Sequence, residues 1–417
     1  MDVRRVTQLR LDYGEDQPLC WDAPAGRHVD RHVAPVPLAD PKAETLRVLR
    51  APLEFPPLEQ AVVPGDRVAL AVGPRVPQVE CVLAAVWEVL SGRGVRPEDV
   101  MVLQARVGTQ RPQADLRLAF PRAVRRRVHV RTFDARRHSL ETGTVTYLAS
   151  TVGGERIYLA RPLNDADVVI PITTMRFDPL LGYRGATSVL YPWLSTEDAV
   201  RRLRGQGHPE LSPTDGRPLR DLVEEVGWLL GVQFAVQVVP AGRGGVAGVF
   251  AGAPDAVQRR ALDALQEFWF VRRERRAATV LVSVDTPPQT QTWADVAAAA
   301  WLGRQLVQRG GRIVVLSALS AEPEGTFGIL QKAEEPHDVL PALRKDPPTD
   351  VIEVTQLVDA VRWARVYLLS RCEPDLVDDL FLVPLESPEE VRRLLEQSTS
   401  TLCVDAAPFA FGRVERS

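Results

Sequence analysis

The chain has 417 residues, long enough for two or three domains with sizeable cores. Hydrophobic residues make up 45% of it and charged residues 25%, as in ordinary soluble globular proteins, and the net charge of -3 gives no sign of a polyanionic partner. No apolar run reaches the eighteen or so residues that cross a membrane, and no signal-peptide core follows Met1. Four scattered cysteines argue against a disulfide framework. The sequence therefore predicts a cytoplasmic protein that does not bind membranes.

Residues from Val62 to Val284 alternate short β-branched strands with helical stretches. This pattern is typical of parallel or mixed sheets wrapped by helices. Apolar residues recur at helical spacing in two segments, which predicts helices at Gln78 to Ser91 and Pro218 to Leu230. The expected strands are Arg67 to Val72, Met101 to Ala105, Val128 to Phe133, Val168 to Ile170 and Gln233 to Pro240.

A basic stretch from Arg122 to His138 could be a nucleic-acid patch or a solvated strand with its flanks. Val128 and Val130 alternate with polar residues, as in a half-buried strand. This alternation favours the solvated strand, and we expect no nucleic-acid partner. The glycine-rich stretch Gly242 to Gly245 is expected to be a hairpin turn, since it does not open a helix directly after a strand.

The segment Asp255 to Arg276 is predicted to be a long helix that bridges two domains, one spanning residues 1–275 and the other residues 276–417. After it the alternation of strands and helices resumes, which predicts a second α/β unit. Its helices are expected at Trp293 to Arg309, Gln356 to Arg365 and Pro388 to Gln397. Its strands are expected at Thr279 to Val284, Arg312 to Ala318, Val366 to Ser370, Phe381 to Pro384 and Thr401 to Asp405.

The segment from Asn164 to Trp193 has the layout of an active-site segment. A short buried strand, Val168 to Ile170, is followed by a loop that carries Asp178, then Gly182-Tyr183-Arg184-Gly185, then Ser188. Open α/β sheets bind ligands at the carboxyl ends of their strands, where this loop is expected to lie.

These features resemble the nickel-dependent lactate racemase (LarA) family, with its Ala-Asp-x-x-Ile strand and Gly-Tyr/Phe-Ser-Gly-Gly-x-Lys loop. Here the strand is Ala166 to Ile170 and the loop core is Gly182 to Gly185. Gly108 to Pro112 is similar to a Gly-Thr-His-Arg-Pro element of the family. The resemblance extends from about Leu11 to about Leu380. It implies a two-domain α/β fold with an interdomain cleft as its site, and a hydroxyacid (lactate) racemase, an enzyme of the isomerase class.

The same resemblance implies a loss, because the family's functional residues are replaced. Its two acid/base histidines correspond to Gln110 and Asp178, and its cofactor-bearing lysine corresponds to Ser188. In its Tyr-Gln-x-x-Lys helix, the Gln and Lys slots hold Asp295 and Ala298. The family would imply a nickel-pincer nucleotide, but the chain's only lysines, Lys42, Lys332 and Lys345, lie in other segments. We therefore expect no cofactor.

One histidine could still ligate a metal. His208 lies near the position where the family has a nickel-ligating histidine. The family's spacing, counted from the lysine position, points to Arg204 instead. An ordinary loop histidine is the alternative.

The remaining candidates are residues that could bind an anion or act as a base. Arg75, Arg111 and Arg184 with Tyr183 could clamp a carboxylate or phosphate if they converge, or they could be surface residues. Asp178 could be a base or could cap the following turn. Ser188 has no neighbouring His or Lys that would activate it as a nucleophile.

Two hypotheses follow. In the first, the protein is a divergent family member without racemase activity. It is then a pseudoenzyme that retains a cleft for a small anion. In the second, an active 2-hydroxyacid racemase or epimerase uses an altered site around Asp178, Gln110 and Arg111. Because Gln110, Asp178, Ser188 and Ala298 replace four functional positions at once, the sequence favours the first hypothesis.

Overall fold

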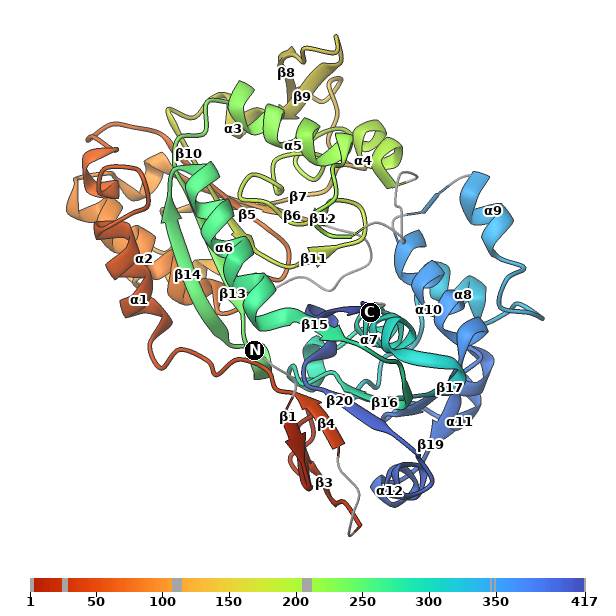
Figure 1. The fold of residues 1–417 in the computed structure, drawn as a ribbon. Helices are drawn as coiled ribbons and strands as arrows, with labels where there is room; N and C mark the ends of the chain where they lie inside the picture. The colour runs from red at the N-terminus through yellow and green to blue at the C-terminus, as the bar shows by residue number, and fades with distance from the viewer. Residues whose placement is uncertain are drawn as a thin grey trace. The chain divides into compact units, whose positions relative to one another are not determined.

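The computed structural model describes residues 4–24, 29–106, 115–204, 212–345, 347–348 and 350–415 (Figure 1). The chain forms two compact units. Unit 1 consists of Met1–Val36, Ala241–Gly244 and Gln266–Ser417, and unit 2 of Pro37–Pro240 and Gly245–Leu265. This division differs from a boundary near residue 275, because the N-terminal strand β4 (Val29–His32) pairs with β20 (Thr401–Val404) of the C-terminal part.

Unit 2 is built on a six-stranded sheet in the order β14-β13-β10-β5-β6-β7. All neighbouring strands are parallel except β14, which runs antiparallel to β13. The five strands predicted in this region are confirmed, and the 242–245 turn does join β13 to β14. The bounds are β5 Val68–Val72, β6 Val100–Ala105, β7 His129–Phe133, β10 Val168–Thr174, β13 Ala235–Pro240 and β14 Val246–Gly252.

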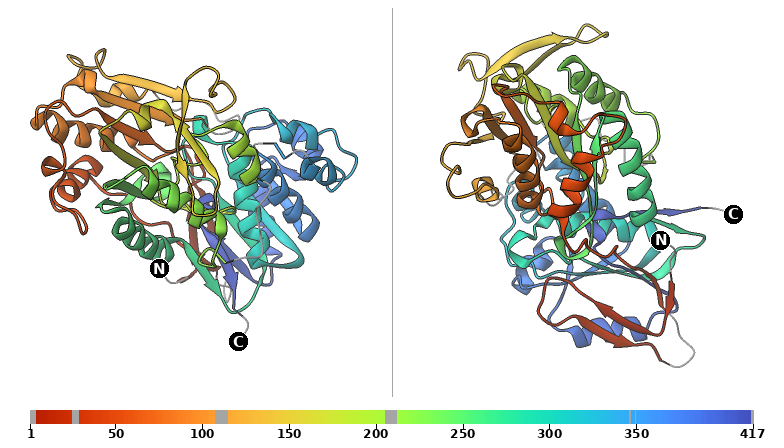
Figure 2. Two further views of the ribbon diagram at one scale, coloured as in Figure 1. Left: turned by 90° about the horizontal axis from the view of Figure 1, so that it is seen from above. Right: turned by 90° about the vertical axis from the view of Figure 1, so that its left-hand side faces the viewer.

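Helices cover both faces of this sheet (Figures 1 and 2). One face packs against α1 and α2, through residues such as Leu49, Val82 and Leu83. The other packs against α3, α4, α5 and the hairpin β8–β9, and α6 adds Val257 beside Ala235. The bounds are α1 Pro41–Arg50, α2 Val79–Gly92, α3 Arg161–Asn164, α4 Glu197–Arg204, α5 Pro218–Leu229, α6 Pro254–Trp269, β8 Val145–Ser150 and β9 Arg156–Ala160.

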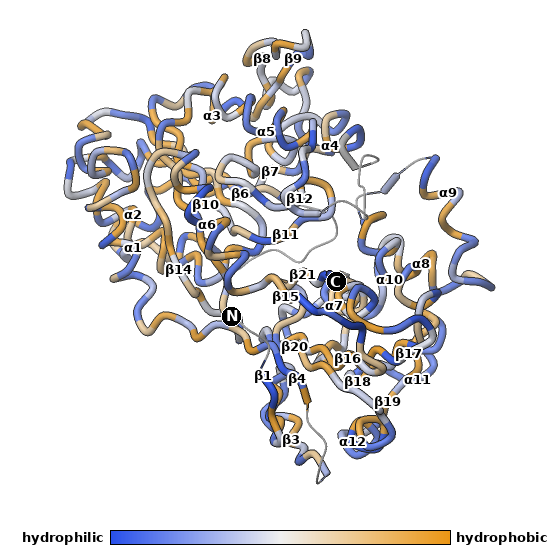
Figure 3. The backbone as a smooth tube through the Cα atoms, viewed as in Figure 1, coloured by the Kyte–Doolittle hydropathy of each residue, from blue (hydrophilic) through white to orange (hydrophobic). Residues whose placement is uncertain are grey.

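Unit 1 is built on a seven-stranded sheet in the order β1-β4-β20-β16-β17-β18-β19. Its central strands are parallel, and every residue of β16 except Ala278 is buried. Figure 3 colours the backbone of this sheet by hydropathy. The strand expected from Phe381 is β19, which begins two residues later, at Val383. The bounds are β1 Arg4–Val6, β16 Ala277–Ser283, β17 Val307–Leu316, β18 Arg365–Leu369 and β19 Val383–Leu385.

The hairpin β2–β3 and helix α12 cover one face of this sheet, where Leu11 and Trp21 pack with Leu281 and Val314. Helices α7 and α10 pack on β16, β17 and β18. The bounds are β2 Gln8–Leu11, β3 Leu19–Asp22, α7 Trp293–Leu306, α8 Thr326–Leu330, α9 Leu340–Lys345, α10 Val351–Trp363, α11 Pro374–Asp379 and α12 Pro388–Glu396.

The helix expected to continue to Arg276 ends earlier. Helix α6 stops at Trp269, and β15 (Phe270–Arg273) follows it and pairs in parallel with β21 (Phe411–Val414). The prediction was wrong here because the strand partner lies some 140 residues away in the sequence, where local periodicity does not register it.

Candidate functional site

The carboxyl edge of the six-stranded sheet has the geometry of a binding site. From β5 the chain proceeds to β6 and β7 on one side, whereas β10 and β13 lie on the other. The loops that follow β5 and β10 therefore leave the sheet at a point where the strand order reverses. Open α/β sheets bind ligands at such switch points.

The loop after β10 folds back on itself and encloses Asp178. Two short strands, β11 (Phe177–Asp178) and β12 (Gly182–Tyr183), pair antiparallel. The Oδ1 atom of Asp178 accepts hydrogen bonds from the amides of Leu180 and Leu181 at 2.9 and 3.0 Å, and Oδ2 accepts one from Nε of Arg184 at 3.0 Å. Burial raises the pKa of Asp178, but Arg184 and the two amides outweigh it and hold the pKa below its ordinary value.

Two arginines at the start of α5, Arg217 as its N-cap and Arg220 in its first turn, fix the other side of this loop. Arg217 donates to the carbonyl oxygens of Pro179 and Leu180, and Arg220 donates to that of Leu181. Both side chains are less than a tenth exposed. Gly182 adopts a φ of +79°, and a Cβ there would lie 2.1 Å from the carbonyl oxygen of Pro213. The loop is therefore a rigid, fully packed element.

Tyr183 is buried beneath one of these arginines. The guanidinium of Arg220 lies 4.6 Å from the centre of the Tyr183 ring. Burial, more than any other cause, raises the pKa of Tyr183. Tyr183 therefore presents a neutral, packed ring at neutral pH.

Ser188 lies in the turn that follows and is only 4% exposed. Its amide donates to the carbonyl oxygen of Gly185 at 3.2 Å. Gln258 of α6 holds the preceding residues, because its Oε1 accepts from the amide of Ala186 at 3.2 Å. A serine hydroxyl here has neither the amine nor the reach of a lysine.

Arg75 lies in the loop after β5, and the structure links this loop to β10. Its carbonyl oxygen accepts a hydrogen bond from the hydroxyl of Thr174, the last residue of β10, at 3.4 Å. Asp178, Tyr183 and Arg184 thus form one cluster, with Arg75 in the adjoining loop. Gln110, Arg111 and His208 lie outside the described residues.

Several polar residues at this edge were not predicted. Thr173 and Gln237 are buried and lie opposite each other on β10 and β13. The Gln237 side-chain amide donates to the carbonyl oxygen of Arg184 at 3.0 Å, whereas its Oε1 is buried and accepts no hydrogen bond from the described part of the chain.

The sequence does contain a signal that could have singled out Arg217 and Arg220. Two arginines at a helix N-terminus oppose the helix dipole, which indicates that they are placed there for another purpose.

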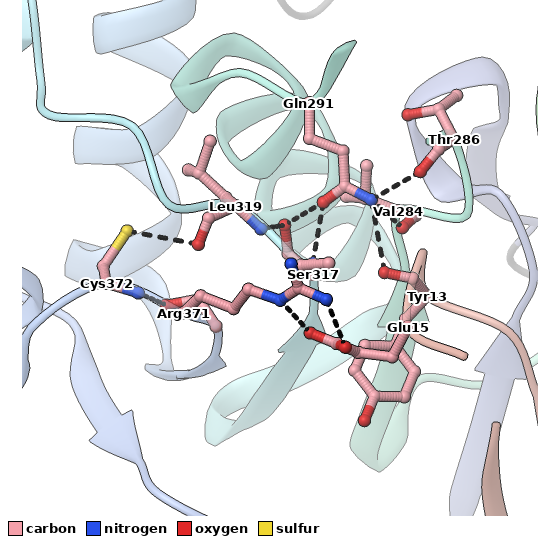
Figure 4. A network of polar contacts seen from close by, with 11 residues as sticks. Tyr13, Glu15, Val284, Thr286, Gln291, Ser317, Leu319, Arg371 and Cys372 are labelled. Carbon is pink, nitrogen blue, oxygen red and sulfur yellow. Dashed lines mark hydrogen bonds and ion pairs between the residues drawn. The ribbon is translucent and has the colours of Figure 1, made fainter. Parts of the chain in front are cut away.

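A second polar network lies in unit 1, at the carboxyl ends of β16 and β17 (Figure 4). The Oε1 atom of Gln291 accepts from the hydroxyl of Ser317 at 2.5 Å and from the amide of Ala318 at 2.8 Å. Its Nε2 donates to the carbonyl oxygens of Tyr13, Val284 and Thr286. Gly14, with a φ of +90°, passes so close that a Cβ would lie 2.3 Å from this Nε2. Gln291 thus joins three loops, and its hydrogen-bonding capacity is used up by the protein.

Of the two positions on α7 that the resemblance relates to the family's Gln and Lys, Asp295 has a structural role. Asp295 accepts from the amide and hydroxyl of Thr292 at 2.9 and 2.8 Å, which makes it part of a capping box at the start of the helix. Asp295 therefore stabilises the end of a helix.

The switch point of the unit 1 sheet carries two carboxylates, Asp285, which is buried, and Asp405, which is partly exposed. Asp285 follows β16 and Asp405 follows β20, which lie side by side. Asp405 accepts two hydrogen bonds from Arg31, whereas Asp285 accepts one, from the amide of Arg243 at 2.7 Å. Burial, supported by the charge of Asp405, raises the pKa of Asp285 to about 7.

The part of the chain that the structure describes contains no group of three or more His, Cys, Asp or Glu side chains arranged to hold a metal ion. Among the described helices, none is long and apolar enough to cross a membrane.

Comparison with known proteins identifies the relatives of this chain. Residues 25–203 match the family described as the lactate racemase N-terminal domain. The fold is similar to the lactate racemase apoprotein from Thermoanaerobacterium thermosaccharolyticum, with a TM-score of 0.77 and 15% identity over 97% of this chain and 100% of that one. It is also similar to a Thermotoga maritima protein, with a TM-score of 0.67 and 13% identity over 90% of this chain and 99% of the other. A search of curated proteins found no match.

Proposed function

We propose that this chain, whose residues 25–203 match the lactate racemase N-terminal domain, is a binding protein of that family which does not catalyse pincer-dependent racemisation. Its ligand is a small organic acid held at the carboxyl edge of the six-stranded sheet. The observation that carries the proposal is that the Asp178 carboxylate already accepts hydrogen bonds from two amides and a guanidinium of its own loop.

Racemisation requires an acid/base group on each side of the reacting carbon, because one face must receive what the other gives up. A useful base has a pKa near the working pH and an accessible lone pair. Asp178 has neither property. Its pKa is held below the ordinary value, and its carboxylate already accepts three hydrogen bonds from its own loop. Asp178 therefore acts as the internal anchor of this loop.

The residues present also do not fit the covalent nickel-pincer nucleotide that the family implies. The tether needs an amine, and Ser188 offers a buried hydroxyl. Lys42, Lys332 and Lys345 are the chain's only lysines. Lys42 forms an ion pair with Glu88 on the helices that cover the other face of this sheet. The proposed function therefore does not involve the nickel-pincer nucleotide.

The groups that remain at the edge suit a hydroxylated acid. Arg184 is neutralised by Asp178. We therefore assign the ligand carboxylate to the other two arginines predicted at this edge, Arg111 and Arg75. The Oε1 of Gln237 is buried and accepts no hydrogen bond from the described part of the chain, so it is the acceptor to which we assign the ligand hydroxyl. A 2-hydroxy acid carries both complementary groups.

The first test measures lactate turnover and intact mass on protein purified from its own cell. We expect neither lactate enantiomer to racemise, with or without nickel, and the mass to equal that of the sequence. Losing one general acid/base typically lowers the rate by a factor of about 10² to 10⁴, so loss of both leaves nothing measurable. Turnover that disappears in Asp178→Asn but persists in Asp263→Asn, an exposed carboxylate of α6, would instead establish the altered-site racemase. A nucleotide-sized mass increment would equally refute the proposal.

The second test is a thermal-shift screen of lactate and other hydroxyacids, phosphates and nucleotides. Ligand at about a hundred times its Kd stabilises the folded state by about 2.7 kcal/mol, enough to raise Tm by a few degrees. We expect Arg111→Ala to abolish the shift. Arg93→Ala, which removes an exposed arginine near the opposite, amino-terminal end of β6, should preserve it. If no anion shifts the wild-type protein, a purely structural role replaces ligand binding.

A further inference from the structure

A groove opens on one face of the six-stranded sheet, beside the first halves of β5 and β6. Its volume is about 560 Å³, within the range of about 300 to 1,000 Å³ that small-molecule sites occupy. It belongs entirely to unit 2. Along β5 it is lined by the amino end, Arg67 to Ala69, whereas along β7 it reaches Phe133 at the carboxyl end. No residue of the proposed anion site lines it.

Strand register explains the floor of the groove. Ala69, Met101 and His129 are paired across β5, β6 and β7, and Leu103 is paired with Arg131 in the next row of the same face. Small and apolar side chains therefore lie in the middle, and polar ones lie on the edge strand β7. The result is an apolar floor with a cationic rim.

The rim charges do not balance. Arg67 is paired with Asp167, and Glu98 and Asp99 are paired with arginines outside the groove. Arg131 is exposed and forms no ion pair within the described part of the chain, and neither does Asp165. Arg161 donates its Nε to the carbonyl oxygen of Gly143 at 2.7 Å, which orients its cation at the rim.

The wall of the groove offers a flat ring surface. His138 is half-buried and stacks on Phe133, with ring centres 4.4 Å apart and planes inclined by 26°. The Nδ1 atom of His138 lies 2.7 Å from the carbonyl oxygen of Asp134, which fixes the orientation of the imidazole. A planar ligand can add to a stack that is already ordered.

We propose that this groove binds a planar aromatic carboxylate, with its ring on the apolar floor beside His138 and its carboxylate on Arg131. An apolar floor selects the ring, and an unpaired guanidinium selects a carboxylate, which it can bind through two parallel hydrogen bonds. Among the described residues, the rim groups without an ion pair are the guanidiniums of Arg131 and Arg161 and the carboxylate of Asp165. Their charges sum to one positive charge, which one ligand carboxylate can neutralise.

The test is isothermal titration of the full chain with 1-naphthoate, compared with its neutral amide and with acetate. We expect naphthoate to bind and both comparison compounds to bind at least about tenfold more weakly, since each lacks one of the two contacts. Arg131→Ala should weaken naphthoate binding by about tenfold or more without changing Tm in the absence of ligand. Arg137→Ala, an exposed arginine of the same segment that does not line the groove, should leave the affinity unchanged.

Three outcomes would overturn this assignment: no heat with naphthoate at millimolar concentration, equal binding of the neutral amide, or unchanged affinity in Arg131→Ala. The groove is distinguished from the carboxyl-edge site by titrating naphthoate in Arg111→Ala and in the presence of lactate. Neither change should alter naphthoate affinity, so failure of one site leaves the other testable.

Discussion

Asp178 and Asp285 show how the number of donors decides the protonation of a buried carboxylate. Both follow a central parallel strand. Asp178 accepts three hydrogen bonds, one of them from a guanidinium, whereas Asp285 accepts one from a backbone amide and lies near another carboxylate. Burial favours the neutral form in both cases, but only at Asp178 do the donors outweigh it. The pKa of Asp178 therefore falls, and that of Asp285 rises.

Asp285 is expected to make the stability of the protein depend on pH. Its folded-state pKa of about 7 lies above the ordinary value of about 3.9, so the folded state binds the proton more tightly. The stabilisation is complete below about pH 4 and is lost as the pH rises through about 7. Asp285→Asn, which keeps an acceptor for the Arg243 amide, should therefore raise the free energy of unfolding at pH 8, by on the order of 2–4 kcal/mol.

The measurement is urea denaturation at a series of pH values, comparing each variant with the wild type at the same pH. This comparison matters because burial lowers the pKa of His32 to about 4, so His32 lowers stability as the pH falls from about 6.5 toward 4. The gain in Asp285→Asn should shrink toward pH 4. Asp22→Asn, the same change at an exposed position, should show no such trend. A gain that does not vary with pH would contradict the raised pKa.

At the scale of secondary structure elements, we predict that Gln291 is worth more than any single hydrogen bond in unit 1. Its amide joins the loops after β2, β16 and β17, so Gln291→Leu leaves several buried donors and acceptors without partners. The expected loss in free energy of unfolding is on the order of 2–4 kcal/mol. Gln308→Leu, at an exposed position, should change it by no more than about 0.5 kcal/mol. Equal effects in the two variants would show that the network carries no special stability.

Elements with a strong local signal could be predicted from the sequence. The β-branched runs of β5, β10 and β16 and the apolar periodicity of α2 are sufficient by themselves. Strand β14 was not predicted, since one internal glycine, Gly248, and one terminal glycine, Gly252, weaken the signal. It forms because β13 offers an antiparallel partner. Strand β15 requires β21, far away in the sequence.

The same limit applies to the candidate site. Loop spacing was enough to place Asp178, Tyr183 and Arg184 in one segment. It gave no indication that Arg217 and Arg220, more than thirty residues later, would hold that segment through its carbonyl oxygens. Such contacts depend on how α5 packs on the sheet, which a one-dimensional pattern does not encode.

At the scale of the whole molecule, the N-terminal residues belong to the unit that contains the C-terminus. Strand β4 pairs with the edge of β20, and Leu11 and Trp21 of the β2–β3 hairpin cover Leu281 and Val314. A chain that begins in one unit, builds the other and then returns cannot complete unit 1 until its last strands are made. Residues 1–36 therefore belong to unit 1, and Leu11 and Trp21 are among those that build its core.

Removal of residues 1–36 should destabilise unit 1 selectively. The deletion exposes the apolar face formed by Leu281 and Val314 and removes the strand that pairs with β20. We expect amide hydrogen exchange to accelerate in β16 and β20, whereas β5 and β10, whose sheet receives nothing from these residues, should keep their protection. Equal loss of protection in both sheets would mean that the two units unfold as one. Unchanged protection in β16 would mean that α7, α10 and α12 suffice to hold the seven-stranded sheet together.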